Sequence, residues 1–321
     1  MTLMTPSGKV AFLVAALLGL FGLRADPIRH DFVAIDEGLG NLLRVDETNA
    51  AHNWRVPIGH AHPRDLQLVG NGLLLVSHDV GFAEYELATG RRVLDLIGYA
   101  NVSSARRLAD GHTLIAYALD KAPLGVFVAE VDANGKALRK TTYPGDYVRL
   151  MRQTPSGTFL FGMNDKIQEG DGKGNFIWTA AVPGFRHAWK ALRLPNGHTI
   201  AAGGYGGFMV EFGAKGELIR RFGGAGQVPA AVHPYFYAMF QILSNGDIVA
   251  ANWQGHGPGH GNSGLQIVEF DSKGGIVWQW SDRAIISSIQ AVLVLDGLDT
   301  GLLHDERNGV MQPLRQEPAL P

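Results

Sequence analysis

Short apolar runs, separated by polar turns that contain glycine, recur along nearly the whole chain. In each unit an apolar run reaches a turn that ends in Gly, and three further runs follow. Successive turns are 39, 46, 40, 49 and 51 residues apart and end at Gly72, Gly111, Gly157, Gly197, Gly246 and Gly297. A repeat of this length with about four strands per unit is typical of β-propeller blades. The pattern therefore predicts an all-β protein with the propeller architecture.

One unit shows the pattern most clearly. We expect its four strands at residues 65–69, 73–77, 82–87 and 92–97. The first turn carries Asn71-Gly72, and Asn-Gly pairs tolerate the positive φ angles of tight hairpin turns. Four consecutive strands joined by such turns form one antiparallel blade.

The two ends of the chain complete the blade count. Residues 32–35, 41–45 and 54–58 look like the last three strands of a unit, and 289–295 looks like a first strand without successors. We therefore expect the C-terminal strand to close the N-terminal blade, which removes open sheet edges. This gives a six-bladed propeller over residues 26–315, followed by a tail at 316–321. Seven blades are the alternative if the residues after Gly297 also pair.

The composition narrows the class of partner. The chain has 321 residues, a net charge of −2 and no cysteine. The charge balance argues against a nucleic-acid partner or an anionic-membrane surface. The lack of cysteine excludes disulfide and thiolate chemistry.

The N-terminus has the pattern of an export signal. Lys9 precedes an apolar run over residues 10–23, and Ala25 supplies a small residue before a cleavage point. We expect residues 1–25 to be a signal peptide, and the protein to be periplasmic or secreted from a bacterium without a stable membrane span after cleavage. An uncleaved membrane anchor is the alternative, although the run is 14 residues long and membrane helices usually need about 20.

Propeller topology sorts the polar residues between two faces. The connections between blades and the loops between second and third strands share one face. Seven of the 12 histidines fall there, namely His60, His62, His78, His187, His233, His256 and His260. Beside the central channel, the first strands begin with Arg149, Trp189, Lys190, Gln241 and Gln290, although the pattern does not say which of them point inward.

We expect this face to bind a ligand through Arg64, His78, Arg186, Lys190, Tyr205, Tyr235, Trp253, His256 and His260. Guanidinium, ammonium and imidazole groups favour a small anionic molecule, and the aromatic rings favour an aromatic one. Imidazole is also suited to acid–base or nucleophilic catalysis. The alternatives are a protein-interaction scaffold, or ordinary polar loops without a ligand.

A glycine-rich loop at residues 254–264 carries His256 and His260. Histidine is a common metal ligand, but Pro258 and the glycines exclude the helix that would place both rings together. The next carboxylate is Glu269. We therefore assign no metal ligand here and expect the loop to be a lid over the face. The pattern identifies no cofactor.

The repeat resembles that of the quinoprotein-like propellers, especially the bacterial arylsulfotransferase-type group. The resemblance covers most of residues 30–297 and rests on the Leu194–Gly197 turn and on Trp178 and Trp278 after glycine turns. It identifies the fold more than the function.

In the arylsulfotransferase group, histidines and an arginine around the channel carry the sulfuryl group. The resemblance thus implies a sulfotransferase-like or lyase-like enzyme, with His62, His187 and His233 as the catalytic candidates and Arg64 and Arg186 stabilising the anion. The chain departs from that pattern because it is shorter and lacks the paired histidines at the entry to a strand. It also lacks the carboxylate cluster for calcium found in quinone-binding propellers, so we expect no bound quinone.

Overall fold

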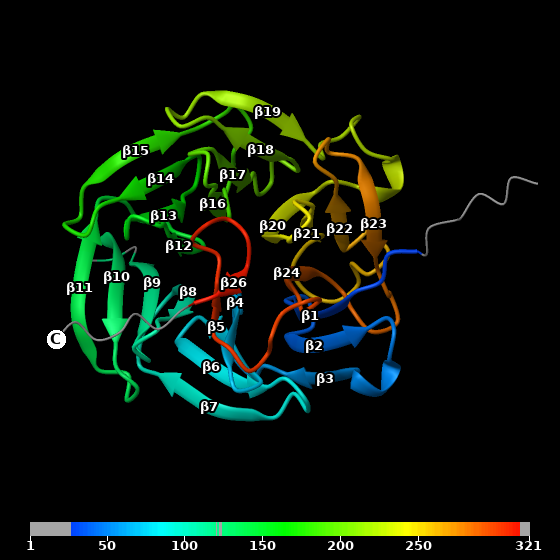
Figure 1. The fold of residues 1–321 in the computed structure, drawn as a ribbon, viewed down its shortest axis with the longest axis horizontal. Coiled ribbons are helices and arrows are strands. Elements are labelled where there is room, and N and C mark those ends of the chain that lie inside the picture. The colour runs from blue at the N-terminus through cyan, green and yellow to red at the C-terminus, as the bar shows by residue number, and fades with distance from the viewer. Residues whose placement is uncertain (1–26, 120, 122–123, 315–321) are drawn as a thin grey trace, which may run out of the picture.

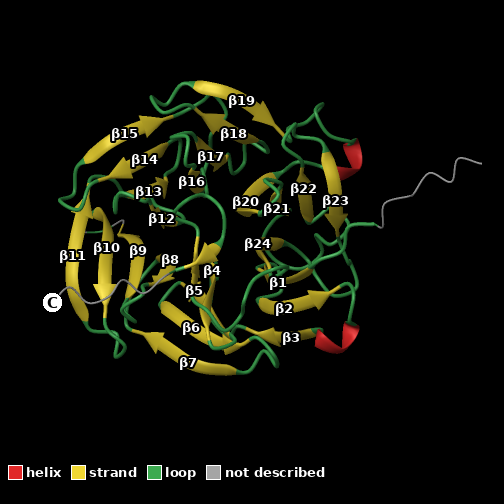
Figure 2. Cartoon of the chain, viewed as in Figure 1, coloured by secondary structure: helices red, strands yellow, loops and turns green. Residues whose placement is uncertain are grey.

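The computed structural model describes residues 27–119, 121 and 124–314 and shows a six-bladed β-propeller (Figure 1). Six four-stranded antiparallel sheets surround a central axis, which confirms the predicted fold class. Two short 3-10 helices, η1 (Ala50–His52) and η2 (Ala230–Val232), interrupt the strands (Figure 2). No helix in these residues has the length and apolarity needed to cross a membrane. The predicted signal peptide at 1–25 and the tail at 316–321 lie outside the described residues.

The blades are numbered from the N-terminus. Blade 1 contains β24 (Ile289–Val294), β1 (Asp31–Asp36), β2 (Asn41–Asp46) and β3 (Trp54–Pro57), and blade 2 contains β4 (Leu66–Gly70), β5 (Leu73–His78), β6 (Gly81–Glu86) and β7 (Arg92–Ile97). Blade 3 contains β8 (Val102–Arg107), β9 (Thr113–Leu119), β10 (Gly125–Val131) and β11 (Ala137–Tyr143), and blade 4 contains β12 (Met151–Gln153), β13 (Phe159–Gly162), β14 (Ile167–Gly170) and β15 (Phe176–Ala180). Blade 5 contains β16 (Ala191–Arg193), β17 (Thr199–Ala202), β18 (Met209–Phe212) and β19 (Leu218–Phe222), and blade 6 contains β20 (Phe236–Ile242), β21 (Ile248–Trp253), β22 (Ile267–Phe270) and β23 (Ile276–Trp280).

The turn between β4 and β5 shows why the repeat forms hairpins. Asn71 and Gly72 both have positive φ, at 52° and 67°. Positive φ at both central residues is the requirement of the hairpin turn whose twist matches that of the strands. The four strands of blade 2 lie within two residues of the predicted ranges.

Blade 1 is closed by the C-terminal strand, as expected. β24 pairs antiparallel with β1, with Phe32 opposite Val294. His30 reinforces this closure, because its Nδ1 lies 2.5 Å from Asp296 and its Nε2 lies 3.0 Å from Glu269 of blade 6. Burial alone would lower the pKa of His30, but the two carboxylates outweigh it and raise the pKa to about 9. The imidazole is therefore cationic at neutral pH and links both ends of the chain to blade 6.

Aromatic residues on the outermost strands join neighbouring blades. The indole Nε1 of Trp178 donates to the carbonyl of Ala214 in blade 5 at 2.9 Å, and that of Trp278 donates to Glu47 in blade 1 at 3.0 Å. Trp54 makes the corresponding bond to the carbonyl of Leu87 in blade 2 at 2.8 Å. Each ring buries apolar area between two sheets while its N–H is satisfied.

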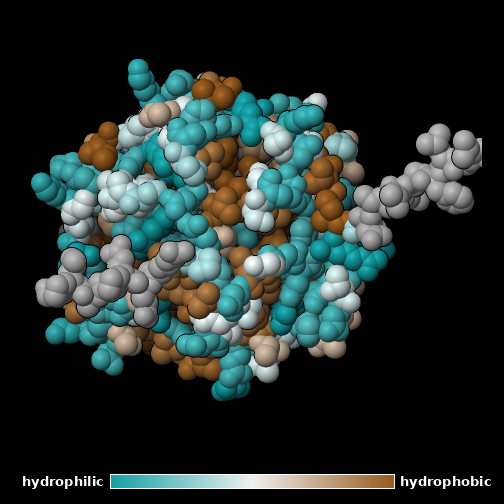
Figure 3. All heavy atoms as spheres, viewed as in Figure 1, coloured by the Kyte–Doolittle hydropathy of each residue, from teal (hydrophilic) through white to brown (hydrophobic). Residues whose placement is uncertain are grey.

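The residues after β24 do not form a seventh blade. They cross the face that carries the turns between first and second strands, and form the two-residue strands β25 (His304–Asp305) and β26 (Gln312–Pro313). Isolated bridges connect this segment to blade 2 at Val69 and to blade 6 at Ile242. Figure 1 shows the segment in red across the middle of the disc, and Figure 3 shows hydrophobic residues gathered towards the middle of this view.

The same segment closes the central channel with an ionic plug. The buried carboxylate of Glu306 accepts hydrogen bonds from Lys190 Nζ and Arg152 Nε, each at 2.7 Å. Asp305 pairs with Arg106 at 2.8 Å, and Asp65 pairs with Arg152 at 2.7 Å. Three cations thus face three carboxylates, and this end of the channel is filled by protein.

Candidate functional site

The opposite end of the channel holds a pocket of about 150 Å³. It lies on the face formed by the connections between blades and by the loops between second and third strands, which is the face that the sequence singles out. Its lining residues are His62, Arg64, Arg149, His187, Trp189, Tyr205, Phe236, Trp253, His256 and Gln290.

Three of these side chains come from equivalent positions in different blades. Arg64, Arg149 and Trp189 each precede the first strand of a blade. In each case the backbone N–H donates to a carbonyl of the second strand or its end, at 3.2, 2.7 and 3.0 Å. Because the backbone register is the same, the three side chains point the same way, into the channel mouth.

The three predicted catalytic histidines share an unusual backbone conformation. His62, His187 and His233 have φ angles of 52°, 57° and 47°. The left-handed region is disfavoured for residues with a Cβ, and such strain is concentrated at functional sites. Each of these histidines lies in a connection between blades, two residues before an Arg, Trp or Tyr.

The pocket is strongly cationic. Arg64 and Arg149 are half-buried, and among the described residues neither forms an ion pair with a carboxylate. Arg149 Nη1 donates to the carbonyl of Val148 at 3.1 Å, and its guanidinium lies 4.0 Å from the ring centre of Tyr147. Burial, and next the charge of Arg149, lowers the pKa of Arg64 to about 10, and burial lowers the pKa of Arg149. Both groups remain charged at neutral pH without a carboxylate paired directly to them, although the nearby charges of Glu37 and Asp79 raise the pKa of Arg64.

Three polar atoms of the pocket residues have no hydrogen-bond partner in the described part of the chain. They are Arg149 Nε, Trp189 Nε1 and Gln290 Oε1, and each is shielded from solvent. Buried polar atoms in proteins are almost always paired, and leaving one unpaired costs about 1–3 kcal/mol. Two donors and one acceptor thus lack a partner within the described residues.

Aromatic rings form one wall of the pocket. Tyr205 meets Phe236 edge to face at 4.7 Å and Trp253 at 6.1 Å. Exposed Tyr235 extends this wall to the rim, 5.8 Å from Tyr205. The guanidinium of Arg186 lies 4.6 Å from the ring centre of Tyr205. This wall can pack against the carbon skeleton of a ligand.

The glycine-rich loop reaches the pocket through His256. Its Nδ1 lies 2.8 Å from Glu37, which also accepts a bond from Trp253 Nε1 at 2.9 Å. His260 bonds instead within the loop, with its Nε2 3.1 Å from the carbonyl of His256. Glu37 therefore orients two pocket residues, while the part played by the loop as a lid stays a prediction.

The two histidines beside the arginines are unprotonated at neutral pH. Burial, and then the charge of Arg64, lowers the pKa of His62. Burial, and then the charges of Arg149 and Arg186, lowers the pKa of His187. A neutral imidazole next to a bound anion can accept a proton from it or gain a charge as the pH falls.

The structure brings half of the 12 predicted site residues into the pocket: His62, Arg64, His187, Tyr205, Trp253 and His256. Arg186, Tyr235 and His233 lie at its rim, where the His233 ring stacks on Tyr235. The other three, His78, Lys190 and His260, are not among the lining residues. Lys190 is fully buried in the channel plug, where Glu306 and the carbonyl of Phe240 occupy its ammonium.

Phe236 also lines the pocket, although no motif in the sequence singles it out. Arg149, Trp189 and Gln290 were recognised only as possible channel residues, because the pleat phase of a first strand cannot be read from its residues. One sequence signal does link two of the lining residues. Arg64 lies two residues after His62, and Trp189 lies two residues after His187.

A larger hollow of about 690 Å³ lies on the opposite face beside the C-terminal segment. Its lining is mostly glycine, alanine and leucine, and its one charged lining residue, Arg107, is paired with Glu84. Among the described residues, none that lines this hollow has a buried polar atom without a hydrogen-bond partner, in contrast to the smaller pocket.

No protein-family model and no curated protein sequence matches the chain. Several solved structures do match the chain. A protein of unknown function from Bacteroides caccae aligns with a TM-score of 0.69 and 22% identity over 83% of this chain and 99% of its own. The WD40 propeller domain of Doa1 aligns with a TM-score of 0.55 and 18% identity over 84% of this chain and 89% of its own.

A catalytically inactive variant of virginiamycin B lyase from Staphylococcus aureus, solved with quinupristin, aligns with a TM-score of 0.51 and 11% identity. This match covers 81% of this chain and 87% of the lyase. At these identities the likeness shows the β-propeller fold and not the activity. The resemblance to arylsulfotransferase-type propellers stays a prediction from the repeat.

Proposed function

We propose that this protein binds a small organic anion in the pocket, with the carboxylate, sulfate or phosphate group of the ligand between Arg64 and Arg149. The observation that supports this most is the pair of half-buried guanidinium groups without a carboxylate partner in the described residues. A bound anion compensates both charges and takes up the free N–H groups of Arg149 and Trp189.

The shape of the site supports the same ligand class. A volume of about 150 Å³ suits a compact charged group and a small carbon skeleton rather than a large molecule. The skeleton would pack against Tyr205 and Trp253. Since Glu306 fills the other end of the channel, the ligand enters and leaves on one face.

Isothermal titration calorimetry of sulfate, phosphate and benzoate tests the proposal. Removing one charge-assisted hydrogen bond costs about 1.5–3 kcal/mol, so Arg64→Met and Arg149→Met should each weaken the best of these ligands by roughly 10- to 100-fold. Arg91→Met is the matched control, because Arg91 is exposed, pairs with Glu86 on the opposite face and carries the same charge. Equal binding by all three variants, or no binding of any of the three anions by the unaltered protein, would overturn the proposal.

A second candidate is an enzyme that acts on the bound anion. It is favoured by the unprotonated imidazoles of His62 and His187 beside the arginine pair. Either ring can act as a base in a lyase-type reaction or as a nucleophile in group transfer. Loss of turnover with retained anion binding in His187→Ala would support the enzyme, and unchanged turnover would exclude a catalytic His187.

The predicted signal peptide at residues 1–25 supports action in the periplasm or outside a bacterial cell. A role as a protein-interaction scaffold remains the alternative from a different class, and failure of every small anion to bind would favour it.

A further inference from the structure

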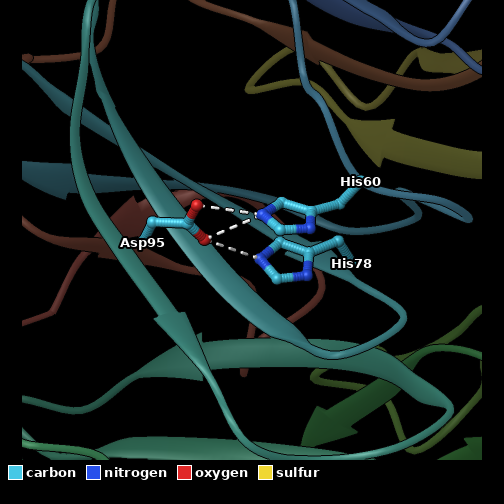
Figure 4. A group of neighbouring side chains, drawn as sticks. All are labelled: His60, His78 and Asp95. Atoms are coloured by element: carbon cyan, nitrogen blue, oxygen red, sulfur yellow. Dashed lines mark hydrogen bonds and ion pairs between the residues drawn. The ribbon is translucent and has the colours of Figure 1, made fainter.

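A second cluster of ionisable groups lies in blade 2, outside the lining of the anion pocket. His60 is in the connection between β3 and β4, His78 ends β5, and Asp95 lies in β7. Figure 4 shows both imidazoles directed at the carboxylate of Asp95. One ligand atom from each residue lies within 4.8 Å of the other two.

The distances within the cluster are short. His60 Nε2 lies 3.0 and 2.9 Å from the two oxygens of Asp95, and His78 Nε2 lies 3.4 Å from Oδ1. The two rings are stacked, with their centres 3.9 Å apart and their planes 13° from parallel.

His78 is buried with few polar contacts. Its side chain is 0% exposed, its Nδ1 has no hydrogen-bond partner within the described residues, and its Nε2 has only the long 3.4 Å contact with Asp95. An unpaired buried polar group costs about 1–3 kcal/mol, so a partner for the ring is to be expected.

We propose that His60, His78 and Asp95 bind a divalent transition-metal ion, with Zn²⁺ as the best match. Two imidazoles and one carboxylate are a common zinc ligand set, and the fourth position is then open to water or another molecule. Zinc–ligand bonds of about 2.0–2.1 Å place tetrahedral ligand atoms roughly 3.3 Å apart. The contacts of 2.9–3.4 Å to Asp95 already lie near that separation.

Ion binding requires two local changes. The stacked rings must turn apart so that both lone pairs point at one ion. Arg92 Nη1 lies 3.0 Å from Asp95 Oδ2, so the ion would take Oδ1 or displace the guanidinium. Arg92 also donates to the carbonyl of Ile58 at 3.2 Å, and the side chain of Arg92 is 41% exposed. The exposure leaves the side chain room to move, whereas the bond to Ile58 holds part of the guanidinium in place.

Two other groups with a histidine and two carboxylates lack the feature that supports this site. His112 Nδ1 is 2.8 Å from Glu130, and His52 Nδ1 is 2.8 Å from Asp46. Both histidines are partly exposed, and neither has a buried nitrogen without a partner. The group at His112 therefore supplies a matched control.

Calorimetric titration of the chelator-treated full chain with Zn²⁺ alone tests the proposal. We expect one ion per chain. His60→Ala and Asp95→Asn should each weaken binding by more than the roughly 100-fold that loss of a second-shell partner can cost. His112→Ala should bind zinc as the unaltered protein does. His60 and Asp95 are suitable targets because their side chains are 21% and 30% exposed, so these substitutions avoid the buried position of His78.

A second measurement does not depend on any variant. The unaltered protein loaded with Co²⁺ should show the visible absorption of a four-coordinate site, and added Zn²⁺ should remove it. Failure to bind either ion, or equal zinc binding by His60→Ala, Asp95→Asn and His112→Ala, would overturn the proposal. The test is independent of the anion pocket, since none of the three ligands lines it.

Discussion

Charge compensation explains the pocket at the scale of single residues. Elsewhere in the described chain, buried cations such as Arg106, Arg152 and Lys190 pair with carboxylates. Arg64 and Arg149 do not, although burial lowers the pKa of each. This contrast within one channel separates a structural ion cluster at one end from a cationic pocket at the other, which we propose takes an external anion.

The histidines of the pocket predict how anion binding depends on pH. Because burial and the neighbouring arginines lower the pKa values of His62 and His187, both rings are mostly neutral at neutral pH and gain charge as the pH falls. Each new charge near the anion adds attraction, so sulfate affinity should rise by roughly three- to tenfold from about pH 7.5 to about pH 5.5. Sulfate is the appropriate probe because it does not titrate in this range.

Calorimetry at several pH values measures this effect. A His62→Gln/His187→Gln double variant should retain sulfate binding and lose most of the pH dependence. An affinity that stays flat or falls towards low pH, or an unchanged slope in the double variant, would show that these rings do not face the anion.

At the scale of secondary-structure elements, two C-terminal strands complete the fold. The apolar run at 289–295 predicts β24, because a first strand without successors fits the incomplete N-terminal unit. The segment that carries β25 has no such signal. Asp305 of β25 pairs with the distant Arg106 through its charge, and a strand of two residues leaves no periodic pattern.

The plug should contribute strongly to stability. Glu306→Gln preserves the shape of the side chain but leaves Lys190 and Arg152 short of one negative charge. The three cations around Glu306 lower its pKa although burial alone would raise it, so a carboxylate is the form that the fold contains. Breaking a buried pair by removing one partner costs about 3–5 kcal/mol, and we expect a loss of that size in the free energy of unfolding.

Urea unfolding followed by tryptophan fluorescence measures this loss. Glu217→Gln is the control, since Glu217 is exposed and such substitutions stay within about 0.5 kcal/mol. A Glu306→Gln variant as stable as this control would show that the segment does not hold the channel closed.

For the molecule as a whole, the sequence was sufficient for the architecture and for part of the site. The spacing of Gly72, Gly111 and the later turns predicts six blades, and topology alone assigns His62, His187 and His256 to the face where the pocket opens. These features depend on local turn chemistry and on strand order, which a repeated pattern reveals.

The remaining features of the two sites depend on contacts between residues that are distant in the sequence. Whether Arg149 points inward is decided by strand register, and whether Lys190 is free depends on Glu306, 116 residues away. The grouping of His60 and His78 with Asp95 likewise arises only when two strands of blade 2 pack against the connection from blade 1. No local pattern of residue types encodes such pairings.

We propose that Arg64 and Arg149 hold an anion between them. Anomalous diffraction from crystals soaked in selenate tests it most directly, because selenate imitates sulfate and its position is read from the selenium signal. We predict a peak in the pocket within hydrogen-bond distance of both guanidinium groups, and none there in Arg149→Met. Selenate bound only elsewhere on the surface, with both guanidinium groups paired to carboxylates of the protein, would contradict the account.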